Sequence, residues 1–205
     1  MTAQRKKLYI VLIFILVAVA FLVNGIYAAD RMQKSISQKI IRLHVRANSD
    51  SEEDQQLKLK VKTAVVEYLK PLLADSSSIE ESRNILEENT EAVLEVARQV
   101  IASEGYEYEV TAYFEESYFP LKTYGDVALP PGIYEAYRID IGEHEGKNWW
   151  CVLYPPLCFV DETHAVCGDE SLEQLSSVLD EAEYEAVTEY KLEFRYFTFL
   201  NGLIE

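Results

Sequence analysis

The stretch IYEAYRIDIGEHEGKNWWCVLY, residues 133–154, decides the fold class. Apolar and polar side chains alternate over 133–141, which is the pattern of a strand with one face in the core. Residues 149–154 are apolar on both faces, as in a central strand. The glycine-bearing segment 142–147 turns the chain between them. These features predict two strands of one sheet, paired as a hairpin.

Three other stretches show the same period of two, at 40–47, 106–114 and 191–200. In the first of them, His44 falls on the polar face and is expected at the surface. All three are predicted to be strands.

Helical spacing of apolar residues follows three predicted capping boxes, in which a side chain at the helix start accepts from an early backbone amide. The first helix is expected to end near Pro71 and the second near Ser103, and the third is strongly acidic. The boxes are Ser49 with Glu52, Ser78 with Glu81, and Ser171 with Gln174. The chain therefore predicts an α+β fold, a mostly antiparallel four- or five-stranded sheet with two or three helices packed on one face.

The N-terminus differs from the rest of the chain. Basic residues at 5–7 precede sixteen apolar residues at 8–23, and the small pair Ala28 and Ala29 follows. A helix through Ala29 is long enough to cross a bilayer, and the small pair also resembles a cleavage site, so a signal peptide and a retained anchor both stay open. The basic flank keeps the N-terminus in the cytoplasm.

The expected organisation is an export signal or signal anchor at 1–29, a membrane-proximal linker at 30–39, and a single exported domain at 40–205. The domain is expected outside the cytoplasm, with membrane contact through residues 8–29 if the signal is uncleaved.

Composition and charge exclude some classes of partner. With 49% hydrophobic and 12% aromatic residues, the chain is globular rather than disordered. Its formal net charge is -16, and every acidic residue lies beyond position 29. Such a surface repels phosphate, so nucleic acid and anionic lipid are not expected to bind.

The usual signatures of catalysis are missing from the sequence. It has no glycine-rich phosphate loop, no HExxH pair and no GxSxG elbow. The acidic residues are expected on a solvated surface and single out no catalytic pair, and His44, His144 and His164 are expected at the surface. We predict no cofactor, no metal, no small-molecule substrate and no enzymatic activity.

The three cysteines form the one cluster of ligand-type side chains with His164. The spacing of Cys151, Cys158, His164 and Cys167 lacks the short knuckle of a zinc site. A nucleophilic pair of His164 with Cys158 or Cys167 is an alternative. Outside the cytoplasm thiols tend to pair, and a Cys158–Cys167 disulfide is our first expectation, with Cys151 buried alone in its strand. Three unpaired buried cysteines remain open.

Several segments resemble the stage II sporulation protein R family of endospore-forming bacteria. They are NWWCVLYPPLCFVD at 148–161, FPLKTYG at 119–125, LPPGIY at 129–134, LHVRANSD at 43–50 and LKLKV at 57–61. The resemblance covers about residues 40–161. The tail from 163 onward resembles nothing that we identify.

This resemblance implies a secreted or signal-anchored protein of intercellular communication. Such proteins are made in the forespore, cross its membrane into the intermembrane space of the sporangium, and trigger a membrane-embedded aspartic protease of the mother cell, stage II sporulation protein GA. That protease then processes the sigma-E precursor. An exported cell-wall enzyme using a Cys-His or carboxylate pair, and a scaffold of the septal envelope, are the alternatives.

Two surfaces are candidates for contact with the protease. Trp149 and Trp150 point to opposite faces of their strand, so one can be an exposed anchor, unless both are covered. The loop 119–131 carries Phe119, Lys122 and Tyr124, and long loops with proline and glycine often serve recognition.

Overall fold

A computed structural model of the chain describes residues 3–156 and 169–189. The predicted strand at 191–200 lies outside these residues. The elements are α1 Ala3–Ser37, β1 Ile41–Arg46, α2 Glu52–Leu73, α3 Ile79–Glu88, α4 Thr90–Ser103, β2 Val110–Phe119, β3 Lys122–Tyr124, β4 Val127–Leu129, β5 Gly132–Ile141, β6 Asn148–Tyr154, α5 Asp169–Val178 and α6 Glu181–Thr188. The predicted α+β class is confirmed.

The main sheet has the strand order β2-β5-β1-β6. β2 pairs with β5 antiparallel, β1 pairs with β5 parallel, and β6 pairs with β1 antiparallel. The predicted hairpin of β5 with β6 is therefore wrong, because β1 lies between them. The β5–β6 connection crosses the end of β1, where the amides of Glu145 and Gly146 donate to the carbonyls of Asn48 and Ala47. The alternation of side chains shows which residues face the core, but it does not show which strands pair, so the strand order could not be predicted from it.

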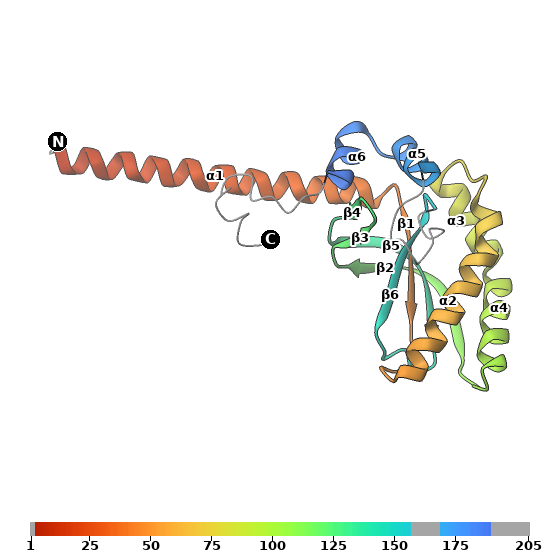
Figure 1. Ribbon diagram of the computed structural model, residues 1–205. Helices are drawn as coiled ribbons and strands as arrows, with labels where there is room; N and C mark the ends of the chain where they lie inside the picture. Colours follow the sequence, from red (N-terminus) through yellow and green to blue (C-terminus); the bar gives the residue numbers. More distant parts are fainter. Residues whose placement is uncertain (1–2, 157–168, 190–205) are drawn as a thin grey trace.

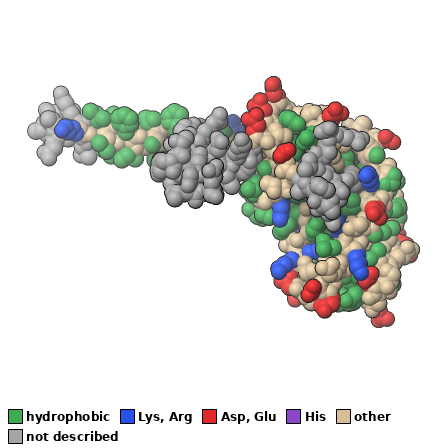
Figure 2. All heavy atoms as spheres, in the orientation of Figure 1, with side chains coloured by type: hydrophobic (Ala, Val, Ile, Leu, Met, Phe, Trp, Pro, Cys, Tyr) green, Lys and Arg blue, Asp and Glu red, His purple; other side chains and the backbone are tan. Residues whose placement is uncertain are grey.

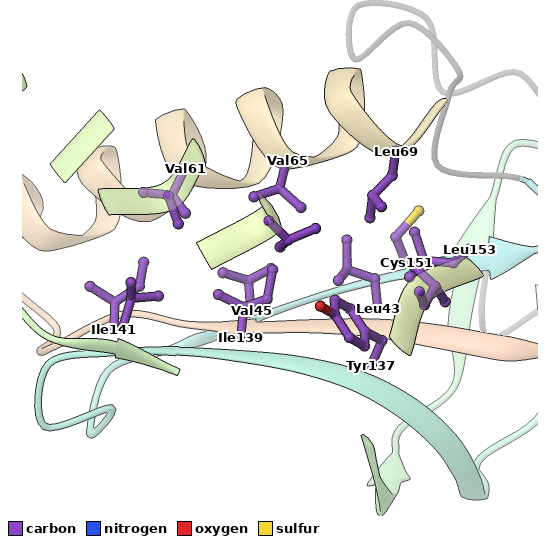
Figure 3. Close-up of a cluster of buried hydrophobic side chains, with 14 of the residues drawn as sticks. Leu43, Val45, Val61, Val65, Leu69, Tyr137, Ile139, Ile141, Cys151 and Leu153 are labelled. Atoms are coloured by element: carbon purple, nitrogen blue, oxygen red, sulfur yellow. The ribbon is translucent and has the colours of Figure 1, made fainter. Parts of the chain in front are cut away.

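Helices α2, α3 and α4 cover the first face of the sheet (Figure 1). Their apolar stripes and one face of the strands form the larger core. Figure 3 shows side chains of α2 directed at those of β1, β5 and β6: Val61, Val65 and Leu69 above Leu43, Val45, Tyr137, Ile139, Ile141, Cys151 and Leu153. Full burial of each aliphatic side chain of this kind contributes about 1.5–3 kcal/mol.

Helix α2 begins at a different cap from the predicted one. Ser51 is the N-cap, and its side chain accepts from the amide of Asp54 at 3.2 Å. Ser49, the predicted cap, instead donates its hydroxyl to the Asp54 carboxylate. The helix continues through Pro71 and ends at Leu73, close to the predicted end.

The other two predicted boxes fare differently. Ser78 caps α3 as expected, accepting from the amide of Glu81 at 3.1 Å, but α3 ends at Glu88 and α4 starts afresh, so the single predicted helix is two. Ser171 lies inside α5 and is not its cap. A complete capping box that the sequence analysis missed joins Asp180 and Glu183 at the start of α6.

The second face of the sheet is half covered rather than open to water. The two-stranded sheet of β3 and β4, helices α5 and α6 and the end of α1 enclose a smaller core over it. Its buried members are Ile36, Ile40, Phe119, Val127, Leu129, Tyr134, Ala136, Val152, Leu175, Leu179 and Val187.

Helix α1 runs without a break from the apolar N-terminus into the domain. Residues 30–37, expected as a linker, are helical, and Ile36 is fully buried against the second face. Among the residues described, α1 is the one helix long and apolar enough to cross a membrane, with a mean hydropathy of 2.8 over its most apolar window. Apolar side chains of α1 are exposed between Tyr9 and Tyr27, and Figure 2 shows some of them on the stretch of the helix that grey atoms leave visible.

Candidate functional site

A fully buried arginine organises the second face of the sheet. Arg42 on β1 donates from Nε to the carbonyl of Cys151 at 3.0 Å and from Nη2 to the hydroxyl of Tyr124 at 2.9 Å. Its guanidinium carbon lies 4.3 Å from the ring centroid of Phe119 and 5.0 Å from that of Tyr134. Burial lowers the pKa of Arg42 from its ordinary value, and no described carboxylate forms an ion pair with it. Aromatic ring faces stabilise this buried cation in place of an acid.

A second cation–aromatic contact lies at the edge of the same group. The ammonium of Lys122 lies 4.2 Å from the ring centroid of Trp150, and the Tyr124 hydroxyl donates to the Trp150 carbonyl at 3.3 Å. These three side chains are half-buried, so each keeps a solvent-facing part. We call Arg42, His44, Phe119, Lys122, Tyr124, Tyr134 and Trp150 the aromatic–cation cluster, and Lys122, Tyr124 and Trp150 its rim.

His44 belongs to this cluster and is not a surface residue as predicted. Its side chain is 6% exposed, stacks on Trp150 with 6.0 Å between ring centroids, and holds Asn148 Oδ1 2.8 Å from Nε2. Burial lowers the pKa of His44, so it is neutral at pH 7. The prediction failed because the alternation of β1 indicated a solvent-facing side, whereas Phe119 and Trp150 pack against His44 there. His144 is exposed as expected, and His164 lies outside the described residues.

Three buried polar atoms of the cluster have no hydrogen-bond partner within the described part of the chain: Arg42 Nη1, His44 Nδ1 and Trp150 Nε1. Buried polar groups in native proteins are nearly always satisfied. The cluster therefore combines stacking and cation–π contacts with a hydrogen-bond network that is not closed.

The part of the second face beyond the smaller core is polar. Arg138 on β5 donates to Asp140 Oδ1 at 2.9 Å and pairs with Glu115 of β2, while the Tyr113 hydroxyl donates to Asp140 Oδ2 at 2.9 Å. Burial opposes the ionisation of Glu115, but hydrogen bonds from Ser117 and Arg138 lower its pKa overall. The charges of this part are paired with one another, which makes it a structural surface.

The structure brings together four of the five residues that the sequence analysis singled out for partner contact. Phe119, Lys122, Tyr124 and Trp150 meet in the cluster, although Phe119 is fully buried and can only support its neighbours. Trp149 lies on the first face, half-buried against the larger core, with the ammonium of Lys62 4.8 Å from its ring centroid. Both tryptophans are thus partly covered, each next to a lysine.

A second group of polar residues was missed as a unit. Asn48 and Ser49 both donate to Asp54 Oδ2, at 2.9 and 2.5 Å, and the backbone amides of Glu143 and Lys147 donate to Asn48 and Asp50. Burial opposes the ionisation of Asp54, but the hydrogen bonds from Ser49 and Asn48 outweigh it and lower the pKa. These contacts fix the β5–β6 connection against the start of α2, and the signal for them was the run of short polar residues after β1.

The structure contradicts the expectation for one cysteine, Cys151. Cys151 is disulfide-bonded, so the expectation that it is buried alone is wrong. The predicted pair, Cys158 with Cys167, lies outside the described residues, as does its proposed base His164. Within the described ranges, no group of three or more His, Cys, Asp or Glu side chains could hold a metal ion.

Comparison with known proteins gives two matches. The family described as Stage II sporulation protein R matches residues 37–164. The Bacillus subtilis (strain 168) protein named Stage II sporulation protein R is 35% identical over 190 residues, which cover 90% of this chain and 84% of that protein. No solved structure matches.

Proposed function

The chain belongs to the stage II sporulation protein R family, and from this premise we propose that it is an exported sporulation signal. In this proposal it binds a membrane-embedded aspartic protease of the mother cell, stage II sporulation protein GA, and so switches on processing of the sigma-E precursor. An apolar N-terminal helix with a basic flank supports export.

The rim of the aromatic–cation cluster is the observation that carries the binding proposal. Trp150 and Tyr124 are half-buried aromatic side chains with polar ends, the type most often found at the energetic centre of protein interfaces. They rest on the buried Arg42 and Phe119, so binding would order few further side chains. Lys122 adds a cation to a strongly acidic protein, which suits an acidic segment of the protease.

Binding alone supplies enough free energy for such a switch. A ligand shifts a two-state equilibrium only by its difference in affinity for the two states. Moving a protease from 1:99 to 99:1 in favour of its active state requires about 5.5 kcal/mol of differential binding. A rim with two aromatic anchors and a cation can provide energies of this order, since single hot-spot residues contribute about 2 kcal/mol or more.

Co-reconstitution tests the proposal. The full chain, the protease and the sigma precursor are placed in lipid vesicles, and the cleaved precursor is measured with the wild-type chain, Lys122→Glu or Lys147→Glu. We expect the rim variant to lower both protease binding and processing, because it reverses the charge beside Trp150. Lys147→Glu makes the same charge change in the exposed β5–β6 connection and should leave both unchanged. Equal activity of the two variants would refute the rim as the contact surface.

The alternatives predict other outcomes of the same system. A cell-wall enzyme would lose activity on substitution of a cysteine or histidine while fold and protease binding persist. A scaffold would act only in a stoichiometric, membrane-bound form, whereas a signalling protein acts at low dose and after release.

Export is tested separately by fusing to the C-terminus a reporter that is active only in the cytoplasm. The reporter should be inactive, and strong reporter activity would contradict export.

A further inference from the structure

An open groove of about 830 Å³ lies where α1 meets the sheet. One wall is the α1 segment from Ile26 to Ser37 with the following Gln38, and the other is formed by the end of β2 and the start of β5. Gln33 Nε2 donates to the carbonyl of Ile133 at 3.0 Å, so the two walls are joined directly. In Figure 1 the ends of β2 and of the β3–β4 hairpin lie beside the last turns of α1, on the side from which α1 enters the domain.

The length of α1 places this groove at the membrane boundary. The helix from Leu8 to Ala29 is about 33 Å long at about 1.5 Å per residue, against a hydrocarbon layer of about 30 Å. Asp30 is the first acidic residue of the chain. Ala29 is therefore at the outer edge of the hydrocarbon, and Ile26 lies about 4–5 Å deeper. Both line the groove, so the opposite wall lies at the same depth.

The opposite wall has the chemistry of an interfacial surface. Tyr118 is 62% exposed and Ile133 is 49% exposed, the two largest exposures of large hydrophobic side chains outside α1 among the described residues. Tyrosine is favoured at the level of lipid headgroups because its ring is apolar and its hydroxyl is polar. Asp30 and Lys34 both line the groove and form an ion pair with 2.8 Å between Oδ2 and Nζ, so their charges cancel.

We propose that this groove binds phospholipid of the bilayer that α1 enters, with the acyl region against Ile26 and Ile133 and the headgroup beside Tyr118. The inference depends on one part of the proposed function, namely that α1 is a membrane helix, and it does not depend on the protease. Continuity of one groove wall with the membrane-spanning stretch favours lipid over a separate partner. The remaining acid, Glu116, and the acidity of the whole chain favour a zwitterionic headgroup over an anionic one. The domain would thus sit on the membrane in one fixed orientation.

Site-specific photocrosslinking tests this inference. A benzophenone amino acid replaces Tyr118 in the full chain, which is reconstituted in phosphatidylcholine vesicles. The control places it at Tyr113, an exposed tyrosine on the opposite face of the same strand, about 17 Å further from the α1 end of β2. Flotation of the vesicles first establishes that the chain is membrane-bound.

We expect the label at position 118 to crosslink lipid several times more than the label at 113, with a lower yield when phosphatidylglycerol replaces phosphatidylcholine. A floating protein with equal lipid labelling at both positions would overturn the groove as a lipid site while leaving the anchor intact. Crosslinking of position 118 to another polypeptide would overturn it in favour of a protein partner. A protein that does not float would refute the anchor itself.

Discussion

Replacing Arg42 by alanine should destabilise the domain by about 2–5 kcal/mol, the range for truncating a large buried side chain. The variant loses two hydrogen bonds from a charged donor, each contributing about 1.5–3 kcal/mol. It also loses cation–π contacts with the surrounding rings, of about 0.5–2 kcal/mol each. Against these losses stands the recovered desolvation cost of a guanidinium without a carboxylate partner, which is several kcal/mol. The net loss is therefore smaller than the sum of the contacts.

Urea titration of the detergent-solubilised full chain, followed by tryptophan fluorescence, measures this loss. Arg98→Ala is the control because Arg98 on α4 is 46% exposed at its side chain and forms ion pairs with the exposed Glu91 at 2.9 Å and Glu95 at 3.9 Å. Surface contacts of this kind contribute about 1 kcal/mol or less. If Arg42→Ala also cost less than about 1 kcal/mol, the buried cation would not hold the cluster together, and the reasoning about the rim's rigid support would fail.

Three further outcomes are expected. The pKa of His44 is lowered chiefly by burial, so between this lowered pKa and about pH 6.5 the unfolded chain binds a proton that the folded chain does not, and the free energy of unfolding falls as the pH decreases through that range. Urea titrations at several pH values should show a smaller fall for His44→Gln than for the wild type; equal slopes would contradict it. Counting free thiols on denatured, unreduced protein should give one of three, and three would exclude a disulfide. Gly146→Ala places a Cβ 2.2 Å from a backbone oxygen, and urea titration should show a loss of more than about 2 kcal/mol in the free energy of unfolding. Gly132→Ala places a Cβ at the same distance from a glutamine side chain, which can move, so the loss should be smaller. The reverse order of the two losses would refute the packing argument.

The fold class was predictable because alternation and capping are local properties. The alternating residues of 133–141 do form a strand with Tyr137, Ile139 and Ile141 in the larger core. The strand order was not predictable, because nothing in the period of 133–154 records that β1 separates its two strands. Tertiary pairing decides that order.

The candidate site was predictable in part for the same reason. Lys122, Tyr124 and Trp150 stood out by residue type, and the structure brings them into one group. Arg42 was missed because a lone arginine on the polar side of an alternating strand is usually solvated, and only the aromatic rings of Phe119, Tyr124 and Tyr134 packed around it make it a buried cation. Arg42 and Tyr124 are 82 residues apart in the chain, so their contact depends on tertiary packing and cannot be predicted from local sequence.

The central claim, activation of the protease by binding, is tested most directly by measuring bound fraction and processing rate together. The full chain is titrated into vesicles containing the protease and the sigma precursor, for the wild type, Lys122→Glu and Lys147→Glu. We predict that all three fall on one line of processing rate against bound fraction, with Lys122→Glu reaching a given bound fraction only at higher concentration. A variant that binds fully but fails to stimulate processing would contradict the claim, since activation would then need a step beyond binding.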